Sequence, residues 1–213
     1  MIEFELNDYY YGTSDNTYLK NMYQNKKIKL KPGITILVGC NGSGKSTFIK
    51  QLENFCDGES ITILSKNLEG CESDLKSRYS YHNQFDKLAN IMSSSEGEIL
   101  YMGIGEIMSL IGHTVSKLSL SDKKFVICID ASDSGSSIDN LIEMRYMLHL
   151  ILDDLTSKNI KAYIVVSTNA YELANGEECF SVNEGKYMTF NDYEDYKQYI
   201  VKTSEWKTNR YNN

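Results

Sequence analysis

The sequence has 213 residues, of which 41% are hydrophobic and 24% charged, a balance typical of a soluble globular protein with a single core. Its formal net charge of −7 argues against a broad nucleic-acid-binding face. No apolar run reaches the roughly 18 residues of a membrane span, and the N-terminal residues include acids, so we expect a cytoplasmic protein. Five scattered cysteines lack the spacing of a zinc site, which favours reduced thiols.

The first part of the chain is rich in strand-forming residues. Alternating apolar residues over 2–11 predict a strand, and the polar run 12–16 predicts a turn after it. A second short strand is expected near residues 27–30. We therefore expect a small antiparallel β-subdomain ahead of the α/β part of the chain.

Residues 39–47 read Gly-Cys-Asn-Gly-Ser-Gly-Lys-Ser-Thr and follow the apolar run 34–38 directly. They match the pattern G-x-x-x-x-G-K-S of a phosphate-binding loop, or P-loop, with a buried strand before it and a helix after it. The glycines let backbone N–H groups point inward around phosphate oxygens at a helix N-terminus. A Gly-rich turn with an unrelated lysine is the alternative, and the agreement of strand, loop and helix argues against it.

The residue types of this loop fit a bound nucleotide. Lys45 can reach the β- and γ-phosphates, which makes it a candidate catalytic residue, and the Ser46 hydroxyl can coordinate Mg²⁺. The residues of the loop that we expect to bind the nucleotide are Gly39, Asn41, Gly42, Ser43, Gly44, Lys45, Ser46 and Thr47.

The sequence Asn-Gly-Ser-Gly-Lys-Ser-Thr resembles the Walker A segment of ABC-type ATPases. It is preceded by Leu-Lys-Pro-Gly and a hydrophobic strand, as in that family. That superfamily includes transporter nucleotide-binding domains, SMC heads and DNA-repair ATPases. The resemblance implies an α/β fold with a mostly parallel sheet, ATP and Mg²⁺ as cofactors, and a homodimer with ATP at its interface. It also implies a signature motif, a Walker B strand and a switch residue, in that order along the chain.

Helices and strands alternate through the rest of the sequence. In chain order the predicted elements are a helix over 45–55, a strand over 60–64, helices around 85–92 and 98–118, a strand over 125–129, a helix over 138–156, strands over 162–166, 179–182 and 187–190, and a helix from residue 193 onward. The turn between the last two strands is expected to be a hairpin. The part at about 67–118 is interpreted as a short helical insert without the heptad run of a coiled coil.

The signature candidate lies inside this insert, where residues 95–98 read Ser-Glu-Gly-Glu. They fit the Ser-x-Gly-Glu form of repair-type ABC proteins. The resemblance implies that Ser95 and Gly97 bind the γ-phosphate of ATP held by the other protomer, through a hydroxyl, an N–H group and a helix N-terminus. A capping box at the start of the following helix explains the same residues and is compatible with that role.

The Walker B candidate is the buried strand 125–129, which ends at Asp130. An acid at the carboxyl end of a parallel strand lies beside the P-loop, so Asp130 is the expected Mg²⁺ ligand together with Ser46. ABC ATPases usually have a glutamate next, which is the base that orients the attacking water. This chain has Ala131 there, and Asp133 is the candidate substitute. Slow hydrolysis, use of Asp133 and an alanine introduced to trap ATP all fit the sequence.

The switch position follows the strand 162–166. ABC ATPases typically have a histidine there that contacts the γ-phosphate, and this chain has Asn169. An asparagine can hydrogen-bond a phosphate oxygen but carries no charge. Asn169 is therefore a candidate catalytic residue, and the N-cap of the following helix is the alternative for it.

The resemblance covers about residues 28–190, and we interpret 1–213 as one ABC-type ATPase domain. The motifs are more similar to SMC and DNA-repair heads than to transporter domains, and also to small stand-alone ABC-type ATPases of phages and bacterial mobile elements. Three classes remain open: an ATPase acting on an unknown protein partner or nucleic acid, a hydrolysis-deficient ATP-sensing switch, and a small-molecule kinase. Three arginines in the whole chain are too few for a kinase. The lysines over 197–210 are interpreted as a water-exposed face rather than a DNA contact.

Overall fold

The computed structural model describes residues 1–7, 22–69, 71–94, 96–117 and 124–211. In chain order the elements are β1 (Ile2–Glu5), β2 (Lys27–Leu30), β3 (Gly33–Val38), α1 (Lys45–Gly58), β4 (Thr62–Asn67), α2 (Cys71–Tyr81), α3 (Phe85–Ser93), α4 (Glu96–Lys117), β5 (Lys124–Asp130), α5 (Ile138–Ser157), β6 (Lys161–Ser167), α6 (Tyr171–Ala174), β7 (Cys179–Ser181), β8 (Lys186–Met188) and α7 (Tyr193–Tyr211).

The central sheet has the strand order β4-β5-β6-β3-β7-β8. The pairs from β4 to β7 are parallel, and β8 pairs antiparallel with β7 through the expected hairpin. β1 and β2 form a separate antiparallel pair. These findings confirm the expected mostly parallel sheet and the N-terminal antiparallel part. Because β6 lies between β3 and β5, the carboxyl ends of these three strands meet at one edge of the sheet.

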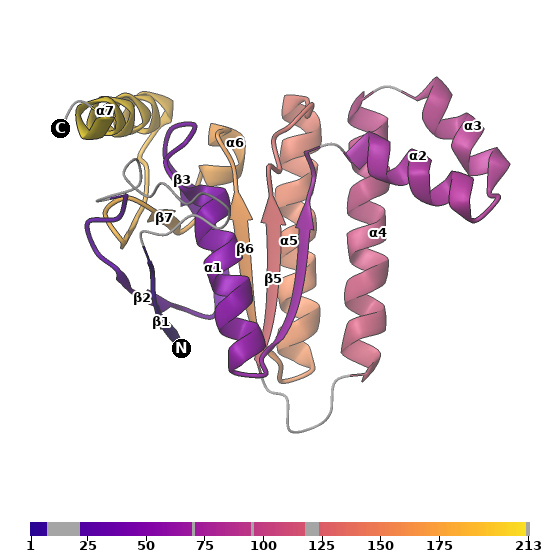
Figure 1. Ribbon diagram of the computed structural model, residues 1–213, viewed down its shortest axis with the longest axis horizontal. Helices are drawn as coiled ribbons and strands as arrows, with labels where there is room; N and C mark the ends of the chain where they lie inside the picture. The colour runs from indigo at the N-terminus through magenta and orange to yellow at the C-terminus, as the bar shows by residue number, and fades with distance from the viewer. Residues whose placement is uncertain (8–21, 70, 95, 118–123, 212–213) are drawn as a thin grey trace.

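Both faces of the sheet are covered (Figure 1). Phe125, Ile127 and Ile129 of β5 pack with residues of α4 and α5, whereas Val126 and Cys128 pack with residues of α1, β1 and β2. This alternation follows from the period of two in a strand and explains why β5 is apolar on both faces. The site therefore stands on a sheet that is fixed from two sides.

Three helices, α2, α3 and α4, occupy the region that we interpret as a helical insert, and the outer part of this region has a small core of its own. Leu75, Ile91 and Ile99 are buried there, and Arg78 pairs with Glu106. Figure 1 shows α2 and α3 at the end of the molecule opposite α7. α2 is not among the helices expected from the sequence, because its polar residues show no helical period of hydrophobicity.

Several boundaries differ from those expected, most clearly in the first part of the chain. The strand expected over 2–11 ends as β1 at Glu5, and residues 8–21, which include the predicted turn, lie outside the described part. α1 runs to Gly58, and the following strand starts at Thr62 rather than at residue 60. Ser60 has a φ of 54°, and the Ile61 N–H donates to the Cys56 carbonyl over 2.9 Å, so residue 60 ends the helix instead of starting the strand.

The structure also bears on the state of the cysteines and on the question of a membrane span. Four cysteines carry free thiols in buried positions: Cys40, Cys56, Cys128 and Cys179. Among the helices that the structure describes, none combines the length and the apolar content that a membrane crossing needs.

The contact between α1 and the N-terminal strands generates a prediction about stability. Phe48 is completely buried, and its ring lies 5.5 Å from that of Phe4, whereas Phe85 on α3 is 65% exposed. Phe48→Ala should lower the free energy of unfolding by about 3–5 kcal/mol, because it leaves a cavity. Phe85→Ala should change it by less than about 0.5 kcal/mol. Urea denaturation of both variants measures the difference, and equal effects would contradict this packing.

Candidate nucleotide-binding site

A groove with a volume of about 610 Å³ lies at the carboxyl edge of the sheet, beside the N-terminal end of α1. The residues that line it are Met22, Asn41, Gly42, Gly44, Lys45, Ser46, Thr47, Glu69, Asp130, Ala131, Asp133, Ser134, Ser167 and Asn169. The structure thus brings together most of the P-loop with the ends of β4, β5 and β6. Gly39 and Ser43 do not line the groove, and they shape the loop from behind.

The P-loop owes its shape to glycines with positive φ. Gly42 has a φ of 74° and Gly44 one of 101°, values that L-residues with side chains rarely adopt. A Cβ atom on Gly44 would also lie 2.6 Å from the Met22 Sδ. Gly44 is the N-cap of α1, so the free N–H groups of the first helical turn face the groove. This end of the helix suits an anion.

Lys45 is the most constrained charge in the groove. Its side chain is only 9% exposed, and its Nζ donates to the Gly39 carbonyl at 2.7 Å, the Cys40 carbonyl at 3.3 Å and the Asn169 Oδ1 at 2.8 Å. Burial lowers the pKa of Lys45, and the nearby Asp133 carboxylate acts in the opposite direction. All three ammonium protons have acceptors, so the charge is held in place at the centre of the groove.

Asp130 and Ser46 are placed as a pair of oxygen donors. Asp130 is 7% exposed, and its Oδ1 accepts hydrogen bonds from the Ser167 hydroxyl and, over 3.1 Å, from the Ala131 N–H. Ser46 is exposed and lines the same groove. Mg²⁺ is usually held by one or two carboxylates together with substrate phosphates and water. The oxygens of Asp130 and Ser46 therefore fit Mg²⁺ that is bound together with a nucleotide. No group of three or more His, Cys, Asp or Glu side chains that could hold a metal ion occurs among the described residues.

Ala131 turns the chain away from β5. It has a φ of 52°, and its N–H lies 3.0 Å from the Ser167 hydroxyl. Ser132, which is completely buried, donates its hydroxyl proton to the Ser167 carbonyl over 2.7 Å. The turn is thus anchored on the end of β6. At the position of the expected base, the groove is lined by a methyl group that cannot accept a proton.

Asp133 and Asn169 contact each other across the groove. The Asp133 Oδ2 accepts the Asn169 backbone N–H at 3.0 Å and its side-chain amide at 3.3 Å. Because the Asn169 Oδ1 in turn accepts from Lys45, the three side chains form one chain of polar contacts. The alternative role of Asn169 as an N-cap is wrong, since Ala170 occupies that position and no side chain caps α6.

Sequence reasoning missed Glu69 and Met22 as groove residues. Glu69 comes two residues after β4, whose register pairs Asn67 with Asp130, and the Leu68 N–H donates to the Asp130 carbonyl over 3.0 Å. The only signal for Glu69 is its place after a strand that pairs with the Walker B strand. Met22 lies before β2 and belongs to no motif, so the sequence offers no signal for its place in the groove.

The signature candidate is described only in part. Ser95 lies outside the described residues, and Gly97 belongs to the first turn of α4. Its expected role toward a second protomer stays a prediction.

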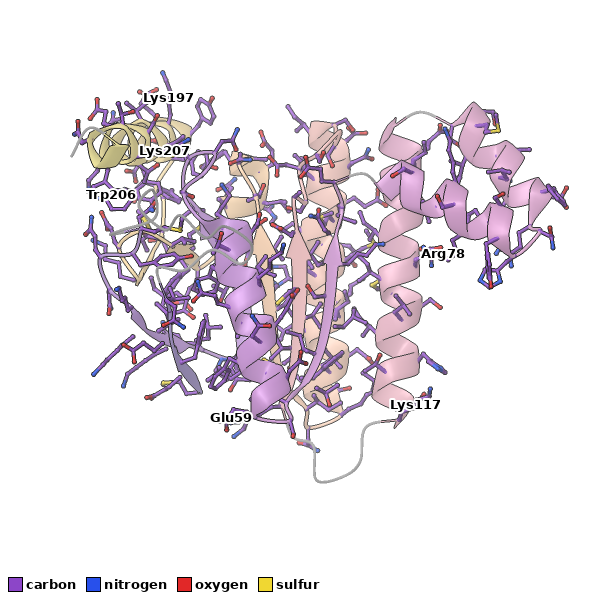
Figure 2. The ribbon with its side chains drawn as sticks, viewed as in Figure 1. Glu59, Arg78, Lys117, Lys197, Trp206 and Lys207 are labelled. Carbon is purple, nitrogen blue, oxygen red and sulfur yellow. The ribbon has the colours of Figure 1, made fainter. Side chains whose placement is uncertain are left out.

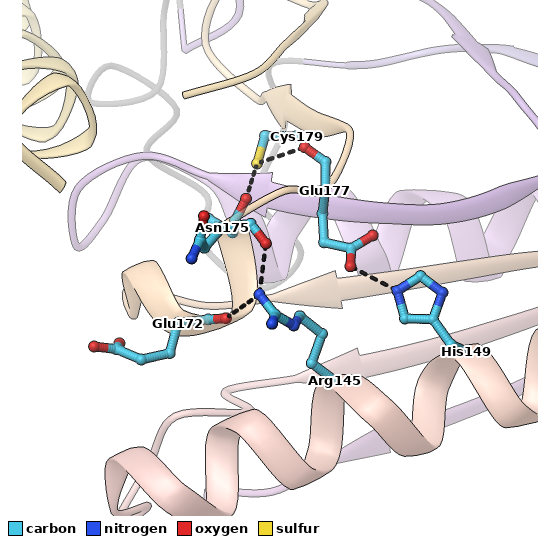
Figure 3. A network of polar contacts seen from close by, with 7 residues as sticks. Arg145, His149, Glu172, Asn175, Glu177 and Cys179 are labelled. Atoms are coloured by element: carbon cyan, nitrogen blue, oxygen red, sulfur yellow. Dashed lines mark hydrogen bonds and ion pairs between the residues drawn. The ribbon is translucent and has the colours of Figure 1, made fainter. Parts of the chain in front are cut away.

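A second, smaller hollow lies between α5 and the chain after α6 (Figure 3). Arg145 donates to the carbonyl groups of Glu172, at 3.3 Å, and Asn175, at 2.6 Å, and His149 pairs with Glu177 at 2.6 Å. Carbonyl groups at the end of α6 are thereby satisfied. Arg145 is therefore committed to holding α6 and not to binding a phosphate.

A lysine that projects from the first turn of a helix into a loop of backbone amides, next to a strand that ends in an acid, defines a P-loop NTPase. The comparison with protein families agrees with this class. A family model described as an AAA domain matches residues 20–161, well over half of the chain, and the protein therefore belongs to the AAA domain family of nucleotide-binding P-loop ATPases. No curated protein matches the sequence. The matched segment contains the P-loop, the helical insert and β5, and it ends before Asn169 and α7.

Proposed function

We propose that the protein is an ABC-type ATPase that binds ATP with Mg²⁺, dimerises around it and acts on an unidentified protein partner or nucleic acid. The observation that carries this proposal is the chain of contacts from Lys45 through Asn169 to Asp133. It links the P-loop to the segment that follows β6 and to the turn that follows β5. The charge of Lys45 is therefore connected by hydrogen bonds to both of these segments.

The described side chains suit the phosphates of ATP. The N–H groups of the first turn of α1 can donate hydrogen bonds to phosphate oxygens, and Lys45 can exchange its present acceptors for the β- and γ-phosphates. Ser46 and Asp130 would hold Mg²⁺, which supplies positive charge against the phosphate oxygens. Asn169 can then donate to the γ-phosphate through its amide while Asp133 keeps it oriented.

The first candidate for a general base is Asp133, and the second is Glu69. Asp133 lines the groove, and one of its oxygens already accepts two hydrogen bonds from Asn169. Glu69 lines the groove from the side of β4. Neither occupies the position of Ala131, directly after Asp130. The methyl group of Ala131 favours the second candidate function, an ATP-sensing switch with little turnover.

A role as a small-molecule kinase is disfavoured by the arginines. Arg145 holds α6, and Arg78 pairs with Glu106 in the insert. Clamps on two phosphorylated substrates usually need several free guanidinium groups. The dimeric arrangement is favoured by the Ser-x-Gly-Glu motif, which includes Gly97 at the N-terminal end of α4. A helix N-terminus of this kind can complete the site of a second protomer.

ATP binding is tested with Lys45→Ala. This variant should bind Mg-ATP at least about tenfold more weakly, because it removes a charge-assisted hydrogen bond to the phosphates. Lys50→Ala is the matched control, since Lys50 is an exposed lysine on the same helix, and it should leave the affinity unchanged. Isothermal titration calorimetry gives both dissociation constants. Equal affinities for Lys45→Ala and the wild type would contradict the assignment.

Turnover is tested at residue 131. General-base catalysis contributes typically ~10²–10⁴-fold, so Ala131→Glu should raise the rate of ATP hydrolysis at least roughly tenfold. Ala131→Gln controls for side-chain size without a carboxylate and should not raise the rate. Asp133→Asn should abolish the remaining hydrolysis if Asp133 is the substitute base, and Glu69→Gln makes the same comparison for Glu69. Steady-state phosphate release measures all four rates. Equal rates for the Glu and Gln variants would show that the base lies elsewhere.

Dimerisation is tested by light scattering with Mg-ATP. The wild type should form a dimer with ATP and a monomer without it, because ATP completes the interface. Ser95→Arg should remain monomeric under both conditions, since a bulky cation at the signature position blocks the closed arrangement. A wild type that stays monomeric at micromolar concentration with ATP, or a Ser95→Arg variant that dimerises equally, would contradict the signature interpretation.

A further inference from the structure

One face of α7 contacts the P-loop. Tyr199, Thr203 and Lys207 follow each other at intervals of four residues, so they lie on the same side of the helix. The Tyr199 hydroxyl donates to the Ser181 hydroxyl on β7 over 2.7 Å, and Thr203 is only 4% exposed. Figure 2 labels Lys207 on the side of α7 that faces the loop and Lys197 on the outer side. The expectation that this lysine cluster only faces water is therefore wrong for Lys207.

Lys207 fixes one peptide group of the P-loop. Its Nζ donates to the Asn41 carbonyl over 2.8 Å, and a Cβ atom on Gly42 would lie equally close to it, at 2.8 Å. The C=O and N–H of a trans peptide point in opposite directions. The Gly42 N–H therefore points away from α7 and toward the groove, which Asn41 and Gly42 line and Lys207 does not. A contact behind the loop thus aims an amide at the place where a phosphate binds.

Thr203 fixes a second peptide group in the opposite sense. The Cys40 N–H donates to the Thr203 Oγ1 over 3.0 Å, and the contact is buried. The carbonyl of the same peptide belongs to Gly39 and accepts the Lys45 Nζ at 2.7 Å. Thr203 therefore holds the acceptor that positions the ammonium group of Lys45.

A third contact of this kind comes from outside α7. The Asn183 amide, in the turn after β7, donates to the Ser43 carbonyl over 3.0 Å, which aims the Gly44 N–H the other way. Alternate peptides of the loop are thus held from behind by the C-terminal part of the chain. This part lies outside residues 20–161 that match the AAA domain family.

We propose that Thr203 and Lys207 are positioning residues for nucleotide phosphates, and that α7 keeps the P-loop in its phosphate-binding conformation. The proposal rests on the proposed binding of ATP. Amides that already point at the phosphates need no reorganisation when ATP binds, which raises affinity. Lys207 also places a positive charge directly behind the loop. Docking of α7 and occupation of the P-loop are then coupled: a change that loosens one weakens the other.

Matched variants test this proposal by calorimetry with Mg-ATP. Thr203→Val keeps the shape of the side chain and removes the hydroxyl, and Lys207→Met keeps most of the length and removes the charge. Each should weaken binding roughly fivefold or more, in the range expected for one hydrogen bond. Thr203→Ser and Lys207→Arg restore the contacts and should stay within about twofold of the wild type. Lys197→Met, a change on the outer side of α7, should have no effect.

Hydrogen–deuterium exchange without nucleotide separates this proposal from the proposed function. Exchange in residues 39–44 should be faster in Thr203→Val and Lys207→Met than in the wild type and the three control variants, when all are measured well below their melting temperatures. A wild type that binds no ATP would contradict the proposed function alone, because exchange still reports whether α7 sets the loop. Unchanged exchange in both variants overturns the role of α7. Faster exchange with unchanged ATP affinity overturns the positioning role and leaves only a structural contact.

Discussion

The buried ammonium group of Lys45 is the constraint that organises the site. A charge that is almost fully removed from water is tolerated only when it is paired and hydrogen-bonded. Its three acceptors follow two neighbouring strands: Gly39 and Cys40 lie at the end of β3, and Asn169 lies after β6. The carboxyl ends of β3 and β6 must therefore lie side by side, and the parallel register of the two strands places them there. Any change that shifts β6 along β3 would leave this charge with an unpaired proton.

The same register explains the second half of the site. β6 lies between β3 and β5, and Ser167 at its end contacts both Asp130 and the backbone of Ala131. The acid expected to hold Mg²⁺ is thus tied to the strand that also carries Asn169. Through Asp133 the turn after β5 reaches back to Asn169, which closes the set of contacts. The groove is consequently lined by hydrogen-bonded side chains where phosphates would bind.

If the protein is the ABC-type ATPase that we propose, Ala131 and Asn169 would both weaken ATP hydrolysis, in two different ways. Ala131 removes a carboxylate from the end of β5, and Asn169 offers an uncharged donor where ABC ATPases usually have a histidine. The retained parts, the P-loop with Lys45 and the groove residues Asp130 and Ser46, are those that we propose bind a nucleotide and its metal. Under the proposed function, the protein would bind ATP through these residues and would depend on Asp133 or Glu69 for hydrolysis. This separation of binding from hydrolysis is what a switch requires.

The sequence by itself determined the P-loop, the Walker B strand and the order of the main helices and strands. These features are local: glycines at fixed positions between a strand and a helix decide the course of residues 39–47, and a run of apolar residues decides β5. Only the tertiary structure decided that Asp133 holds Asn169, that Glu69 enters the groove and that Thr203 and Lys207 of α7 stand behind the loop. Those contacts join residues that lie far apart in the chain, and they depend on strand register and helix packing. No local pattern of residue types encodes them.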